Sequence, residues 1–256
     1  MNNNGLEKWR NDEKALDVER RLMNEALARL GQADRKHGMG RSAGRLIFAL
    51  DLTGSREASL RQARIATSAM FDTIRAIGAV AVKLVYYRGS RECRASEWQD
   101  DPAVLSESMR RLSCEAGYTQ IARVLRLTLA EEEKVSGVVF VGDHFEDAES
   151  AVLPLAETLG QRSIPIFVFH EIADHDERSL EARPIFERIA ELSGGVYCEF
   201  KSDSGAVLRE LLSSVAAFSA AGIEGVKQVA MPETPEGQQL QERLLLFGPA
   251  GTEKRR

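Results

Sequence analysis

The chain has 256 residues, of which 43% are hydrophobic and 29% are charged, a composition that fits one large or two small globular domains. A net charge of −5 and the lack of a basic patch in the sequence exclude general binding to the phosphates of nucleic acids. The longest apolar runs, such as residues 45–50 and 135–141, fall well short of the ~20 residues of a membrane span, so no membrane association is predicted.

The N-terminal region begins with polar residues. Residues 1–5 lead directly into a charged segment, so no secretory signal peptide is predicted. The three cysteines, Cys93, Cys114 and Cys198, are scattered and form no CxxC pair, which is typical of free thiols in a reducing compartment. Together these features predict a cytoplasmic location.

The first segment with helical periodicity covers residues 11–37. Its apolar side chains recur at helical spacing: Leu16, Met23, Leu27 and Leu30. Three glycines between residues 37 and 44 then end the helix and predict a hinge, so residues 1–44 are interpreted as an N-terminal helical arm. Packing onto the main domain or a C-terminal helix, contact with a partner, and self-association all remain open for this arm.

In the next part of the chain, short apolar runs alternate with amphipathic segments. Strands are expected at residues 45–50, 79–87, 92–97, 135–141, 164–169 and 196–200. Helices are expected at residues 57–77, from residue 101, and at residues 118–132, 148–159, 184–192 and 205–220. The alternation predicts an α/β fold that is Rossmann-like and doubly wound, with a mainly parallel sheet and helices on both faces. Because residues 92–97 follow a hairpin turn, they are expected to form one antiparallel edge strand.

The alternating pattern weakens after about residue 222. Residues 231–236 are interpreted as a linker and residues 238–247 as a short helix with one apolar side, followed by a tail. The sequence therefore predicts a main domain over residues 45–222 and a C-terminal linker, short helix and disordered tail over residues 223–256.

Polar oxygen ligands follow the first expected strand. Asp51, Thr53 and Ser55 place one carboxylate and two hydroxyls where the chain turns towards a helix. Ligand sites in open parallel sheets lie beyond the carboxyl ends of the strands, so these side chains are expected at the functional edge. Oxygen ligands of this kind suit a hard cation.

Two further residues complete the candidate site. Thr119 precedes an expected helix, and Asp143 follows the core strand that ends at residue 141. The hydroxyl-rich set suits Mg²⁺ or Mn²⁺ better than Ca²⁺, which takes more oxygen ligands. The alternative interpretation is structural, with Asp51 capping the helix at residues 57–77 and Thr119 acting as an N-cap.

The order Asp51-x-Thr53-x-Ser55, Thr119, Asp143 resembles the metal-ion-dependent adhesion site (MIDAS) of the von Willebrand factor A (vWA) family. The resemblance covers about residues 45–220, and Thr53 keeps the hydroxyl of the commoner Ser. It implies a vWA-like domain that acts as a divalent-cation-dependent protein–protein interaction module, not as an enzyme. It also implies a protein partner whose Asp or Glu completes the metal coordination, and an AAA+ ATPase system as a candidate companion in assembling or maturing another complex.

Three further residues are expected on the rim that a partner would touch. His144 adjoins the site, and His170 and Asp174 follow the strand at residues 164–169. A metal cluster in residues 170–176 is the less favoured interpretation, since a polar surface loop is the default for such a segment.

Two other functions remain as alternatives. A metal-free scaffold of the same fold would keep the sheet and lose the cation. The Asp51-x-Thr53 pair also resembles the start of haloacid dehalogenase-like phosphatases, but those use a second Asp as general acid where Thr53 stands here. The sequence contains no G-x-S-x-G elbow and no GxxxxGK[ST] nucleotide loop.

Overall fold

The computed structural model describes residues 44–56, 80–173, 176–201 and 204–246, together with single positions between residues 60 and 73. The chain divides into two units, Met1–Gly40 and Arg41–Arg256, and every described residue belongs to the second. The predictions for the N-terminal arm, for the C-terminal tail and for Asp174 lie outside the described residues.

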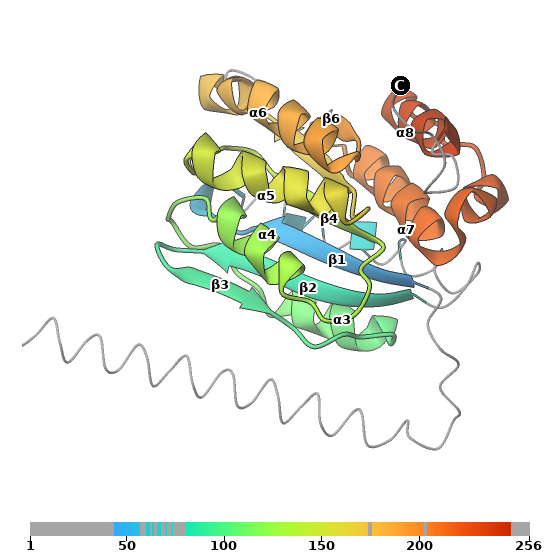
Figure 1. The fold of residues 1–256 in the computed structure, drawn as a ribbon, viewed down its shortest axis with the longest axis horizontal. Helices are drawn as coiled ribbons and strands as arrows, with labels where there is room; N and C mark the ends of the chain where they lie inside the picture. Colours follow the sequence, from blue (N-terminus) through green and yellow to red (C-terminus); the bar gives the residue numbers. More distant parts are fainter. Residues whose placement is uncertain are drawn as a thin grey trace, which may run out of the picture. The chain divides into compact units, whose positions relative to one another are not determined.

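A six-stranded sheet forms the centre of the fold (Figure 1). Its strands are β1 (Gly44–Asp51), β2 (Val80–Arg88), β3 (Glu92–Ala95), β4 (Gly137–Gly142), β5 (Ile166–Ile172) and β6 (Tyr197–Lys201). The strand order is β3-β2-β1-β4-β5-β6, and every neighbouring pair is parallel except β2 and β3. This confirms the predicted mainly parallel sheet with one antiparallel edge strand.

Helices cover both faces of the sheet. They are the short 3-10 helix η1 (Gly54–Arg56) and the helices α3 (Pro102–Arg110), α4 (Ile121–Leu129), α5 (Glu149–Gln161), α6 (Glu177–Ser193), α7 (Gly205–Gln228) and α8 (Pro235–Leu246). Figure 1 shows α4, α5 and α6 side by side over one face. The described positions between residues 60 and 73 are also helical.

The period of two along β1 explains why two separate cores form. Ile47 and Ala49 pack into the core that includes residues of α4, α5 and α6. Leu46, Phe48 and Leu50 point the other way, into the core that includes α7. Because both faces of β1 are buried, its sequence is a continuous apolar run.

Helix α6 begins seven residues before the predicted start at Pro184. Asp176 is its N-cap, and its carboxylate accepts a hydrogen bond from the backbone N of Ser179 at 3.3 Å. Pro184 therefore lies inside the helix. The predicted start was wrong because the sequence interpretation missed the capping aspartate.

The C-terminal helices pack on the same unit as the sheet. Helix α7 is interrupted at Gly222, whose φ of 60° and ψ of −143° suit glycine, so the predicted end at residue 220 coincides with this break. Helix α8 buries Leu240 and Leu244 and contacts α7 and β6. By length and composition α7 could cross a membrane, but the same is true of a core helix, and Leu211 and Val215 are fully buried in the core.

Candidate metal centre

Asp51 and Asp143 lie at the ends of two adjacent strands. Leu50 of β1 is level with Val141 of β4, so Asp51 is level with Gly142 and Asp143 follows one position later. Asp51 is 1% exposed and Asp143 is 7% exposed. A Cβ atom on Gly142 would lie 3.5 Å from the Cβ of Asp51 and would clash with the ring of Phe140 at 2.7 Å. The glycine therefore leaves room for the ring of Phe140 next to the two carboxylates.

Local hydrogen bonds fix the Asp51 carboxylate. Its Oδ1 accepts a hydrogen bond from the backbone N of Thr53 at 2.8 Å, and its Oδ2 accepts one from the Tyr87 hydroxyl at 2.9 Å. Burial raises the pKa of Asp51 to about 6, and the negative charge of Asp143 adds to this rise. The hydrogen bonds from Thr53 and the positive charge of Arg56 act in the opposite direction. A cation beside the two carboxylates would offset the cost of keeping both of them charged.

Asp143 has an oxygen with no partner. Its Oδ1 is buried and accepts no hydrogen bond from any described residue. Its Oδ2 lies 3.7 Å from Nδ1 of His144, which is too long for a hydrogen bond. A buried carboxylate oxygen without a donor is costly, and it is rare in folded proteins unless an ion or water satisfies it. The residues present therefore fit a bound cation.

Two hydroxyls lie in the loop between β1 and η1. The Oγ1 of Thr53 is 3.4 Å from the Oγ of Ser55, with Thr53 buried and Ser55 exposed. The backbone N of Arg56 donates to the carbonyl of Thr53 at 3.0 Å, which closes the turn that brings the two hydroxyls together. This loop would supply neutral oxygen ligands next to Asp51.

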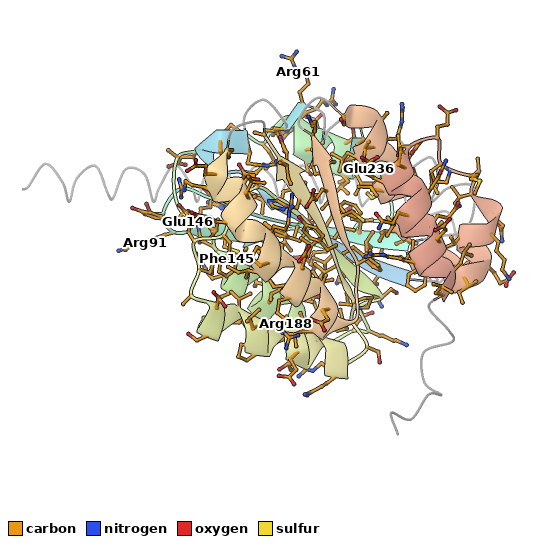
Figure 2. All side chains as sticks on the ribbon, turned by 90° about the horizontal axis from the view of Figure 1, so that it is seen from above. Arg61, Arg91, Phe145, Glu146, Arg188 and Glu236 are labelled. Atoms are coloured by element: carbon orange, nitrogen blue, oxygen red, sulfur yellow. The ribbon has the colours of Figure 1, made fainter. Side chains whose placement is uncertain are left out.

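Thr119 is held by the loop that follows β4. Its hydroxyl donates to Oδ2 of Asp147 at 2.8 Å and accepts from the backbone N of Glu146 at 2.8 Å. One lone pair of this hydroxyl remains available for a further ligand. Glu146 lies at the same end of the molecule as Arg91, which is in the turn after β2, so these contacts are at the carboxyl edge of the sheet (Figure 2).

The N-terminus of α4 is capped from outside the helix. The backbone N atoms of Ile121 and Ala122 donate to the carboxylate of Asp147 at 3.0 and 3.1 Å. The alternative that Thr119 is the N-cap is therefore wrong, since Gln120 occupies that position and Asp147 takes over the capping. No periodic pattern in the sequence indicated this role of Asp147, because it depends on two loops that meet only in the folded chain.

The expected rim residues lie in different environments. His144 places its Nε2 2.7 Å from Oδ2 of Asp176 and so connects the loop after β4 with the start of α6. His170, in contrast, is fully buried inside β5, on the face covered by α6. The prediction that His170 lies on an exposed rim was wrong because β5 continues to Ile172.

His170 contacts the site through the backbone of Asp143. Its Nε2 donates to the backbone carbonyl of Asp143 at 3.1 Å, and its Nδ1 lies 2.7 Å from the hydroxyl of Tyr197. Burial lowers the pKa of His170 to about 4, so the ring is neutral at physiological pH. We assign it a positioning role beneath Asp143.

A buried ion pair lies at the same edge and was not foreseen from the sequence. The guanidinium of Arg56 pairs with the carboxylate of Glu171, and their side chains are 3% and 5% exposed. An arginine that follows a polar loop is normally expected at the surface. The alternation along β5 could have indicated that Glu171 faces away from His170.

Comparison with solved structures identifies the type of fold. No protein-family model matches the chain, and no curated protein matches it by sequence. A solved von Willebrand factor type A structure from Catenulispora acidiphila matches 70% of this chain with a TM-score of 0.55 at 17% identity, and the match spans 43% of that chain. The vWF domain of the type V pili tip protein Mfa5 from Porphyromonas gingivalis matches 72% with a TM-score of 0.55 at 10% identity and is covered over 98% of its length.

A third solved structure, proximal thread matrix protein 1 from the mussel byssus with a zinc-occupied MIDAS motif, matches 68% of this chain. Its TM-score is 0.51 at 12% identity, and the match spans 46% of that chain. The matched part of the chain, 70 to 72% of it, therefore adopts the vWA fold, as the resemblance in the sequence implied.

Proposed function

We propose that this chain binds one divalent cation, Mg²⁺ or Mn²⁺, at the ends of β1 and β4 and uses it to hold an acidic side chain of a protein partner. The observation that carries the proposal is the pair of buried carboxylates of Asp51 and Asp143, together with the Asp143 oxygen that has no donor among the described residues. Thr53, Ser55 and Thr119 would add hydroxyl oxygens. The zinc-occupied motif of the similar mussel protein supports a divalent metal at such a site.

The residues of the chain prepare the site in complementary ways. Thr53 and Tyr87 hold the Asp51 carboxylate in one orientation, and Asp147 holds the hydroxyl of Thr119. Within the proposed ligand set the two aspartates are accompanied by neutral hydroxyls, so a bound cation would supply an electrophilic position that accepts an oxygen from a partner's Asp or Glu. The His144–Asp176 contact would form part of the surface that the partner meets.

An interaction module is favoured over a phosphatase. Thr53 stands where a haloacid dehalogenase-like enzyme would need its general acid, and its hydroxyl lies against Ser55. The similar solved structures are a vWA protein, a pili tip domain and a thread matrix protein. We infer that the cation serves binding rather than turnover.

The test is a calorimetric titration of Mg²⁺ and Mn²⁺ into the full chain after removal of metals with a chelator. We expect one site in the wild type and its loss in Asp143→Asn. Asp101→Asn is the matched control, because Asp101 caps α3 and an asparagine can replace it in that role. A wild-type protein that binds neither ion would contradict the proposal and leave a metal-free scaffold of the same fold.

The cellular setting is also a proposal. The scattered thiols and the resemblance to the vWA family support a cytoplasmic protein that acts beside an AAA+ ATPase system. Proximity labelling with the wild type and with Asp143→Asn would test this, and we expect an ATPase neighbour that only the wild type labels.

A further inference from the structure

The carboxylate of Glu171 is buried near the end of β5, the strand next to β4. Gly142 of β4 is level with His170 of β5, so Asp143 is level with Glu171. Neighbouring strands are about 4.8 Å apart, and level residues on parallel strands point to the same face of the sheet. Two residues earlier on each strand, Val141 and Phe169 share one core, as this rule requires. Glu171 therefore shares the face of Phe169 and lies near the end of β5, level with Asp143, which directly follows β4.

Arg56 reaches this carboxylate from the metal-site loop. It directly follows Ser55 in η1, and its guanidinium forms the buried ion pair with Glu171. In the sheet, β1 and β5 lie on either side of β4. The pair therefore joins the loop after β1 to the end of β5 across the strand that leads into Asp143.

Arg56 cancels the charge of one carboxylate close to the proposed site. Asp51, Asp143 and Glu171 carry three negative charges, and Arg56 carries one positive charge. We propose that Arg56 sets the net charge of the site by holding Glu171 out of the metal coordination, so that the site takes a divalent cation and leaves a position for a partner's carboxylate. This inference rests on the proposed metal binding.

A purely structural ion pair makes a different prediction. If Arg56 only ties the loop to β5, loss of either partner loosens the loop, and both single substitutions weaken metal binding. If Arg56 compensates the charge of Glu171, the two substitutions change the affinity in opposite directions. The sign of the effect therefore separates the two roles.

The experiment uses the full chain with Arg56→Met, Glu171→Gln and the double variant, which form a double-mutant cycle. Mn²⁺ affinity is measured by calorimetry and by the spin-resonance signal of the free ion, and Tb³⁺ affinity by luminescence. We expect Arg56→Met to bind Mn²⁺ about tenfold more tightly and Glu171→Gln about tenfold more weakly, since each substitution changes the charge at a buried site by one unit. The double variant should stay within about threefold of the wild type.

Tb³⁺ provides the sharper readout. A trivalent ion gains more than Mn²⁺ from each added negative charge, so Arg56→Met should favour Tb³⁺ over Mn²⁺ by about tenfold more than the wild type does. Circular dichroism checks the fold of each variant. Should Arg56→Met not fold, Glu171→Gln and the double variant still test the sign.

The outcomes separate the proposed role of Arg56 from the proposed metal binding. Weaker binding in both single variants, or no change in Arg56→Met while the wild type binds Mn²⁺, overturns the role of Arg56 alone. Binding in Arg56→Met without binding in the wild type supports the role of Arg56 and contradicts the proposed function. No binding in any variant overturns both.

Discussion

Two acidic side chains, Glu131 and Asp143, show how differently the fold treats its charged groups. Glu131 accepts a hydrogen bond from Lys83 Nζ at 2.6 Å and another from Trp98 Nε1 at 3.0 Å. The ammonium of Lys83 also lies 5.1 Å from the centre of the Trp98 ring. Asp143 is more deeply buried, and one of its oxygens has no donor within the described residues.

The difference separates a group that serves stability from one that serves binding. A fully paired charge such as Glu131 needs nothing further, and its removal leaves its partners unsatisfied. An unpaired buried oxygen beside a second carboxylate costs free energy in the empty state, and a ligand can recover that cost. The carboxyl edge of the sheet is therefore the region whose energetics change most when a cation is added.

The largest expected effect comes from Asp51→Ala. This change removes one of two carboxylates and should reduce Mg²⁺ and Mn²⁺ affinity by about a hundredfold or more, because each is needed to balance the charge of the ion. The rise in melting temperature that a native-state ligand produces should vanish with it. Thermal unfolding with and without Mn²⁺ checks this, and a variant that keeps the full rise would rule out Asp51 as a ligand.

The carboxyl of Asp51 should make the stability of the metal-free protein fall as the pH rises. Its pKa in the folded chain, about 6, is higher than the ordinary aspartate value of 3.8, so the folded state holds the proton more tightly than the unfolded state between these two values. In metal-free protein Asp51 therefore stabilises the fold less as the pH rises from about 4 to about 6, by up to about 3 kcal/mol, and the loss is complete above pH 6.

Asp51→Asn lacks this titration and provides the comparison. Urea unfolding at pH 4.5 and pH 7 gives the free energy of unfolding for both proteins, and the variant should gain stability relative to the wild type at the higher pH. An equal difference at both pH values would show that the carboxyl of Asp51 is not buried beside Asp143 in solution.

The comparison of Glu131 with Asp143 predicts opposite signs. In the presence of a chelator, Glu131→Gln should lower the free energy of unfolding by about 1 to 2 kcal/mol because Lys83 loses its partner. Asp143→Asn should leave it unchanged or raise it by up to about 1 kcal/mol, because it removes a charge that repels Asp51. Urea denaturation measures the free energy of unfolding of both variants. Equal destabilisation would contradict the distinction between a paired Glu131 and an unpaired Asp143.

The smallest effect is expected for His144→Ala. The contact of His144 with Asp176 joins the loop after β4 to α6, so its loss should lower the free energy of unfolding by about 1 kcal/mol. Because His144 is not among the proposed ligands, Mn²⁺ affinity should stay within about threefold of the wild type. A larger drop in the calorimetric affinity would place His144 in the metal site.

The sheet and two of its acidic residues could be predicted from the sequence for a physical reason. A buried parallel strand is a continuous apolar run, and a ligand residue at its carboxyl end directly follows that run, as Asp51 and Asp143 do. The hairpin before β3 likewise indicated the antiparallel edge strand.

Contacts between distant segments could not be predicted in the same way. His170 follows an apolar run like the two aspartates, but β5 extends two residues beyond it and α6 covers its ring. The pairing of Arg56 with Glu171 and the capping of α4 by Asp147 each join segments far apart in the sequence. Periodicity carries no information on such contacts, because they depend on how the loops meet at the edge of the sheet.

The most direct test of the central claim is the anomalous scattering of crystals of the full chain soaked in Mn²⁺. The account predicts one anomalous peak bounded by the carboxylates of Asp51 and Asp143 and the hydroxyls of Thr53 and Ser55. It also predicts that Glu171 stays paired with Arg56 outside the coordination sphere. Crystals with no peak at this edge, or with a peak only elsewhere on the molecule, would contradict the account.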